Sequence, residues 1–215
     1  LAVRPRLRHE RRMAKLYFSY STMNAGKSTL LLQASYNYVE RGMRTLLFTS
    51  SLYAEGDVGI ISSRLGISAP AEMFGSGDDL FQRVNDHLQE SKVDCVFVDE
   101  AQFLTADQVW QLARVSDRLD VPVMCYGLRT DFRGQLFPGS SELLAVADEL
   151  REVRTICFCG RKATMVVRRD AEGGALREGN QVSIEKSVYV SLCRRHWEEE
   201  IGRWPPKGPQ HDHDH

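Results

Sequence analysis

Short apolar runs alternate with amphipathic stretches along most of the chain. The runs rich in apolar residues, which predict strands, are 16–20, 45–49, 95–98 and 121–126. The stretches that predict helices are 27–41, 79–91, one that opens at Thr105, and 141–150. Strands that alternate with helices are typical of a mostly parallel sheet covered by helices. We therefore expect an α/β core over residues 13–156.

Residues 50–77 interrupt this alternation. They are polar and rich in glycine, and we expect a loop there with one or two short elements.

The pattern changes again after Ile156. A tight cysteine turn at 157–160 is followed by short predicted strands at 165–168 and 181–184, with a hairpin turn at 172–174. We expect a small C-terminal domain over 157–203 and a disordered, proline-containing tail over 204–215.

Composition and charge narrow the class of protein. The 215 residues are 42% hydrophobic, which allows a core, and their net charge is −1. A protein that coats nucleic acid needs a strongly basic face, and a membrane span needs ~20 apolar residues, so we expect neither partner. The first 12 residues hold five arginines and precede Met13, and we interpret them as an N-terminal extension.

Five cysteines, an odd number without a secretory signal, favour a reducing compartment and thus a cytoplasmic location. Cys95 and Cys125 lie inside apolar runs, and we interpret both as small buried hydrophobic residues.

The other three cysteines lie together in the C-terminal third. Cys157 and Cys159 form one pair, and Cys193 with His196 forms a second pair. Three thiolates and an imidazole suit a tetrahedral Zn²⁺ site with no open position, which indicates a structural metal. The alternative is a set of buried thiols beside a surface histidine.

The first predicted strand leads directly into a phosphate-binding sequence. The loop comprises Ser21, Thr22, Met23, Asn24, Ala25, Gly26, Lys27 and Ser28, and it opens a helix. This strand–loop–helix context is the one in which a P-loop binds phosphate through backbone N–H groups and the helix N-terminus. Lys27 would reach the outer phosphates and Ser28 would ligate Mg²⁺. Ser21 replaces the usual first glycine, and the alternative is an ordinary strand-to-helix turn.

Two adjacent carboxylates follow the buried run 95–98. Asp99 would bind Mg²⁺, and Glu100 would be free to take a proton, because ligands of open α/β folds bind at this edge of the sheet. The alternative is a helix start without chemistry.

These features together resemble the type II thymidine kinases, deoxynucleoside kinases with a P-loop core and a zinc-bearing lasso domain. The resemblance runs from Met13 to about Trp197. Its most specific stretches are 13–33, 98–104, 125–137, 157–162 and 189–196.

The resemblance implies a reaction and a set of residues. ATP and thymidine, or deoxyuridine, would give a nucleoside monophosphate and ADP, with Glu100 as the base for the 5′-hydroxyl. The nucleotide site would comprise residues 21–28 with Asp99, Glu100, Ala101 and Gln102. The 128–134 stretch would line the nucleoside pocket, and the nucleoside would contact Met23, Phe103, Leu128, Phe132, Phe137 and Tyr189. Cys157, Cys159, Cys193 and His196 would hold zinc. A homotetramer inhibited by dTTP is also implied.

For Phe132 and Phe137, packing under a long loop is the alternative to contact with a base.

Two departures from the family pattern bear on function. Tyr53 and Glu55 take the places of an Asp-x-Arg pair, and Arg64 is the candidate to contact phosphate instead. In the lasso, 184–186 reads Ile-Glu-Lys where the family has Ile-Gly-Gly, and the segment is one residue shorter.

Two other functions stay open at this point. One is a zinc-ribbon P-loop NTPase that acts on nucleic acid, with Glu100 activating water. The other is a nucleotide-binding regulator with impaired catalysis, suggested by Tyr53 and Glu55.

Overall fold

The computed structural model describes residues 13–53, 59–181 and 188–202. A seven-stranded sheet forms its centre, in the order β3-β4-β2-β5-β6-β1-β7. The strands are β1 (Leu16–Ser21), β2 (Thr45–Ser50), β3 (Gly59–Ser62), β4 (Ser68–Phe74), β5 (Cys95–Val98), β6 (Val123–Leu128) and β7 (Glu149–Glu152). Neighbouring strands are parallel except for β3 and β4, so the predicted mostly parallel sheet is confirmed.

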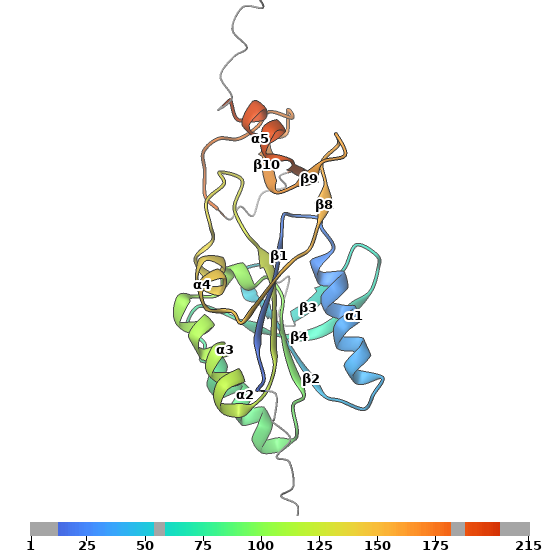
Figure 1. Ribbon diagram of the computed structural model, residues 1–215, viewed down its shortest axis with the longest axis vertical. Coiled ribbons are helices and arrows are strands. Elements are labelled where there is room, and N and C mark those ends of the chain that lie inside the picture. Colours follow the sequence, from blue (N-terminus) through green and yellow to red (C-terminus); the bar gives the residue numbers. More distant parts are fainter. Residues whose placement is uncertain (1–12, 54–58, 182–187, 203–215) are drawn as a thin grey trace, which may run out of the picture.

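Helices cover both faces of the sheet (Figure 1). Helix α1 (Lys27–Val39) packs on one face, and α2 (Leu80–Glu90), α3 (Ala106–Leu119) and α4 (Pro138–Val146) pack on the other. Alternate residues of β5 show why both faces need cover. Cys95 and Phe97 pack with α1, whereas Val96 and Val98 pack with α2, α3 and α4.

Helix boundaries follow local capping chemistry. The Asp79 side chain accepts a hydrogen bond from Gln82 N at 2.9 Å and begins α2. Thr105 and Gln108 form the predicted capping box of α3, each side chain bonded to the backbone of the other.

The one or two short elements expected within residues 50–77 are the strands β3 and β4, which extend the central sheet. A 3₁₀ turn, η1 (Ser51–Tyr53), precedes them. The first half of β4 pairs with β3 and its second half with β2. Pro70 lies in the first half of β4. This half pairs with β3 on one side and with no described strand on the other, so a residue without a backbone N–H is tolerated there.

The prediction of a helix over 141–150 was wrong at both ends. Helix α4 begins earlier, at Pro138, whose fixed φ suits a first helical turn, and it ends at Val146. The following residues become β7, an edge strand parallel to β1. Asp148 joins the two strands, since its Oδ2 accepts a hydrogen bond from Leu16 N at 2.7 Å.

The lasso region, defined here as residues 157–181 and 188–202, lies at the end of the sheet where β1 leads into the P-loop (Figure 1). Strands β8 (Thr155–Ile156) and β9 (Lys162–Ala163) flank the cysteine turn; β10 (Met165–Arg169) pairs antiparallel with β11 (Val188–Leu192), and α5 (Arg194–Glu200) follows. The strand predicted at 181–184 lies largely outside the described residues, and β11 is the partner of β10. The hairpin turn at 172–174 is present, closed by Asp170.

The expected N-terminal extension, Glu55, the 184–186 departure and the tail also lie outside the described residues. The domain boundary after residue 156 stays a prediction. Within 13–53, 59–181 and 188–202, no helix is long and apolar enough to cross a membrane.

Candidate active site and metal cluster

The predicted P-loop connects β1 to α1 and curls around a lysine. Asn24 and Gly26 both have positive φ, 62° and 84°, which turns the chain sharply before the helix begins. The Lys27 ammonium lies under the loop and donates hydrogen bonds to Ser21 Oγ and to the Thr22 carbonyl, both at 3.1 Å. Burial lowers the pKa of Lys27, while the nearby Glu100 and Asp99 charges oppose that shift.

The predicted Mg²⁺ ligands meet across the sheet edge. Ser28 Oγ donates a hydrogen bond to Asp99 Oδ2 at 2.9 Å. The other carboxylate oxygen, Asp99 Oδ1, is buried and has no hydrogen-bond partner among the described residues. Burial, and then the negative charge of Glu100, raises the pKa of Asp99 to about 6. A hydroxyl beside a buried carboxylate with a free oxygen fits a hard divalent cation, which takes oxygen ligands.

Glu100 is held in place from two sides. Its backbone has φ 53°, a left-handed conformation that is costly for a residue with a side chain. The side-chain amide of Gln102 makes both contacts: its Nε2 donates a hydrogen bond to Glu100 Oε2, and its Oε1 accepts one from Leu128 N at 3.0 Å. Gly127 makes room for this amide, since a Cβ there would lie 2.9 Å from Gln102 Oε1. The next strand of the sheet therefore fixes the carboxylate.

Three cavities meet at Glu100, which lines each of them. The largest, about 690 Å³, follows the P-loop and includes Met23 to Leu30, Arg64 and Arg154. A second, about 250 Å³, is lined largely by apolar side chains. A third, about 150 Å³, is polar and contains Ser28 and Asp99. The carboxylate thus separates a phosphate-binding cavity from an apolar pocket.

The six predicted nucleoside-contacting residues all line the 250 Å³ pocket: Met23, Phe103, Leu128, Phe132, Phe137 and Tyr189. Phe103 and Phe137 meet edge to face, with ring centroids 5.8 Å apart. Phe132 and Phe137 are both buried yet still form pocket wall, so the packing and base-contact interpretations are compatible.

Asp131 also lines this pocket, but its carboxylate is committed to its own loop. It accepts hydrogen bonds from the backbone N of Arg133 and of Gln135, and from the Arg133 guanidinium at 3.0 and 3.1 Å. Asp131 therefore shapes the loop, and Glu100 is the pocket carboxylate left to receive a proton.

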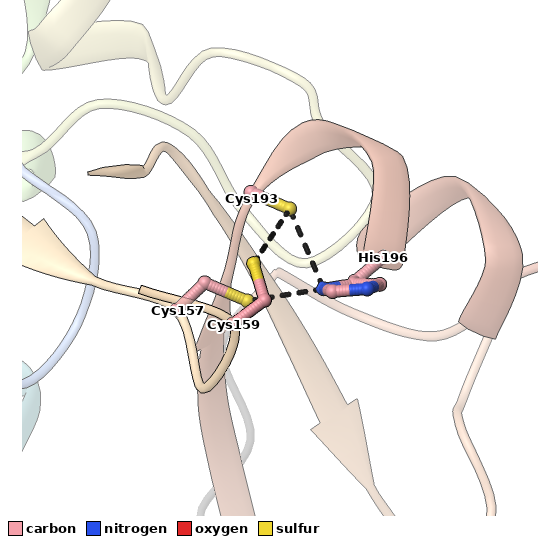
Figure 2. A group of neighbouring side chains, drawn as sticks. All are labelled: Cys157, Cys159, Cys193 and His196. Atoms are coloured by element: carbon pink, nitrogen blue, oxygen red, sulfur yellow. Dashed lines mark hydrogen bonds between the residues drawn. The ribbon is translucent and has the colours of Figure 1, made fainter. Parts of the chain in front are cut away.

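The two cysteine pairs come together at the start of α5. Figure 2 shows Cys157 and Cys159 on their turn facing Cys193 and His196. All four candidate ligand atoms lie within 4.8 Å of one another. The Cys159 and Cys193 sulfurs are 3.9 Å apart, and Cys193 Sγ is 3.5 Å from His196 Nδ1. A tetrahedron with Zn–S bonds of ~2.3 Å has sulfurs about 3.8 Å apart, so the donor set and its spacing fit Zn²⁺.

Electrostatics at Cys157 also favour a metal thiolate. Burial alone would raise the pKa of this thiol. Backbone N–H groups of Cys159 and Cys193 and the His196 side chain lower the pKa to about 6. A thiol that ionises readily is ready to ligate a metal.

The remaining predicted residues are placed less directly. Gln102 lines the apolar pocket and bonds Glu100, whereas Ala101 is fully buried in the main core. Arg64 is exposed and lines the P-loop cavity, as a phosphate contact requires.

Several cavity residues were not among those predicted from the sequence. Arg154 lines the P-loop cavity, and it was missed because the strand before it, β7, was predicted as the end of a helix. Val166 and Gln181 line the apolar pocket from the lasso region. A short strand was predicted at 165–168, but not the pocket it would face.

Residues 14–197 match the family model described as thymidine kinase. A thymidine kinase of Mesorhizobium japonicum is 69% identical over 194 residues, covering 90% of this chain and 96% of the relative. Thymidine kinases of Ruegeria pomeroyi and a Jannaschia species are 63% and 61% identical, covering 91% and 90% of this chain and 100% of each relative.

Proposed function

Because the chain belongs to the thymidine kinase family, which phosphorylates thymidine with ATP, we propose that Glu100 is the general base of this reaction. One observation carries the proposal: Glu100 lines both the P-loop cavity and the apolar pocket. A base must reach the acceptor hydroxyl while the phosphoryl donor lies on the opposite side, and Glu100 occupies that boundary.

On the nucleotide side, backbone N–H groups of Met23 to Ser28 would bind the ATP phosphates, with Lys27 adding a positive charge. Ser28 and Asp99 would hold Mg²⁺, whose charge offsets that developing on the phosphates. Arg64 would contact the phosphates from the opposite wall of the cavity, in place of the arginine that the family carries nearer the second strand.

On the acceptor side, the pyrimidine would lie between the aromatic walls formed by Phe103, Phe132 and Phe137. The 5′-hydroxyl would then point toward Glu100, which accepts its proton as the γ-phosphoryl group is transferred. Membership of the thymidine kinase family favours a pyrimidine over a purine as the base in this pocket. Deoxyuridine should be accepted, since one missing methyl group changes binding by only ~1–3 kcal/mol.

Three further features are part of the proposal. The Cys157–His196 cluster would hold one structural Zn²⁺ per chain. A homotetramer with feedback inhibition by dTTP follows from the family resemblance. A cytoplasmic location suits a cluster of three thiols that must stay reduced to bind metal.

The test is ADP release with each nucleoside in turn and with nucleic acid. We expect turnover with thymidine and deoxyuridine and none with deoxyadenosine. Comparable turnover with deoxyadenosine, or turnover driven by nucleic acid, would contradict the proposed specificity.

Glu100→Gln keeps the shape of the side chain and removes its basicity. We expect kcat to fall by ~10²–10⁴-fold with little change in ATP affinity, measured by single-turnover kinetics and ATP titration. Glu90→Gln, at the exposed end of α2, is the matched control and should keep full activity. A Glu100→Gln enzyme that retained most of its single-turnover rate would show that another group is the base.

A further inference from the structure

A buried tryptophan joins two separate walls of the apolar pocket. Trp197, on α5, is only 4% exposed. Its indole Nε1–H lies 3.1 Å from the Phe132 carbonyl and 3.0 Å from the Val166 carbonyl, so one donor serves two acceptors.

The two acceptors belong to residues that line the 250 Å³ pocket. They come from different parts of the chain: Phe132 follows β6 of the central sheet, and Val166 lies on β10 of the lasso region. The separation between these walls therefore depends on a side chain that does not itself line the pocket.

The loop around Phe132 is shaped to receive the indole. Gly134 has φ 78°, and a Cβ at this position would lie 3.1 Å from the Trp197 ring and 3.1 Å from the end of the Met165 side chain. On the other side of Phe132, Asp131 ties the loop to itself through Arg133 and Gln135. The loop is thus closed internally and attached to the lasso region through the indole.

Helix α5 fixes where the indole lies. The helix begins directly after Cys193 and carries His196, so two of the four candidate metal ligands lie just before Trp197 in the sequence. The Arg169 guanidinium also bonds Glu200 at 2.7 Å, which joins the same helix to β10.

We propose that Trp197 is a positioning residue for the nucleoside, which holds Phe132 and Val166 at the spacing that a pyrimidine requires. The proposal rests on the proposed function, because it assumes that the 250 Å³ pocket binds the nucleoside base. Among the described residues, neither Phe132 nor Val166, whose carbonyls bond the indole, lines the P-loop cavity. Loss of the indole N–H should therefore weaken thymidine binding and leave ATP binding unchanged.

The test is Trp197→Phe, which keeps an aromatic ring and removes the donor. This variant loses the buried hydrogen bond that the indole donates to the Phe132 and Val166 carbonyls. We therefore expect KM for thymidine to increase about five- to tenfold. KM for ATP should stay within about twofold, and kcat at saturating thymidine should change little. Trp110→Phe is the matched control, because Trp110 is 47% exposed on α3 and its Nε1–H bonds only the surface residue Glu142 among the contacts described.

A second measurement requires neither enzyme activity nor a folded Trp197→Phe variant. In a Trp110→Phe/Trp204→Phe background, where Trp204 lies outside the described residues, fluorescence reports on Trp197 alone. Thymidine should reduce acrylamide quenching of Trp197. A bound base would contact both pocket walls, Phe132 and Val166, and so hold them against the indole and restrict access of the quencher. ATP alone should not reduce the quenching.

The outcomes separate this proposal from the proposed function. A wild-type enzyme that does not phosphorylate thymidine would overturn both. A wild-type enzyme that does, paired with a Trp197→Phe variant whose thymidine KM is unchanged, would overturn the positioning role alone. Equal increases in KM for thymidine and for ATP would also overturn it, since they indicate general loosening. If Trp197→Phe does not fold, unchanged quenching of Trp197 on addition of thymidine would have the same meaning.

Discussion

Ionisation of Asp99, which the proposed Mg²⁺ site requires, lowers the stability of the folded protein. Asp99 is buried beside Glu100, and its pKa is raised from 3.8 to about 6, first by burial and then by that neighbouring charge. An acid with a higher pKa in the folded state than in the unfolded state destabilises the fold when it ionises. The penalty is absent below pH ~4, develops as the pH rises toward 6, and is complete above 6. The proposed Mg²⁺ would require the ionised form of Asp99, because a protonated carboxyl is a poor ligand for a cation.

We therefore expect Asp99→Asn to stabilise the protein without metal or nucleotide while abolishing Mg²⁺-dependent turnover. The gain should be about 3 kcal/mol at pH 7.5 and should shrink toward pH 4, where wild-type Asp99 is also neutral. Thermal unfolding at several pH values measures it. Asp117→Asn, on the exposed face of α3, is the control. A gain that did not depend on pH would contradict this explanation of the Asp99 pKa.

At the scale of single elements, α3 is anchored by its first turn. Thr105 Oγ1 accepts a hydrogen bond from Gln108 N, and the Gln108 side chain bonds Thr105 N and also the Gly75 and Asp78 carbonyls. The cap thus ties the start of α3 to the entry of α2, just after the 3₁₀ turn η2 (Ala101–Phe103) that follows Asp99 and Glu100.

Thr105→Ala should lower the free energy of unfolding by about 1 kcal/mol, because the cap hydrogen bond to Gln108 N is lost. Chemical denaturation would measure this loss. Thr105→Ser keeps the hydroxyl and should restore most of the stability. Equal losses in the Ala and Ser variants would show that the methyl group, not the cap, accounts for the effect.

Elements with strong local signals could be predicted from the sequence, and elements defined by distant pairing could not. The apolar run at 95–98 and the Thr105–Gln108 box each carry their signal within a few residues. β7 does not: its sequence, Glu-Leu-Arg-Glu, is as compatible with a helix as with a strand. Its conformation is decided by β1, through backbone pairing and the Asp148 hydrogen bond to Leu16. β3 and β4 were obscured in the same way by a polar, glycine-rich context.

The same division holds for the site. The P-loop, Asp99, Glu100 and the four cluster residues could be identified because each group has a short motif with its own chemistry. Trp197 could not, because its contacts come from packing between the loop after β6 and the lasso region, and Arg154 could not, because it follows a strand that was not predicted. No spacing along the chain records that packing.

For the whole molecule, metal removal should affect the lasso region before the central sheet. The hydrophobic cluster that includes Cys157, Cys193 and Trp197 is small, whereas the sheet has a core on each face, one of them much larger. A module with few buried apolar groups commonly needs a metal to fold.

Cys193→Ser should reduce bound zinc from about one per chain to well below that, as elemental analysis measures. Calorimetry should show a new transition at lower temperature, while ATP binding persists because the P-loop belongs to the sheet. Cys95→Ala, at a thiol buried against α1, should keep its zinc. Folded, active wild-type protein without metal would contradict the assignment.

The position of the four ligands along the chain has a consequence for sequence variation. Two candidate ligands, Cys157 and Cys159, lie at the start of the segment that runs from Cys159 to Cys193. The other two, Cys193 and His196, lie at its end, so a bound metal would join the two ends of this segment. The entropy of closing such a loop grows only slowly with its length. Insertions or deletions in this segment would then cost the fold little in closure entropy. A relative could therefore vary the length of this segment and still keep the metal site that joins its ends.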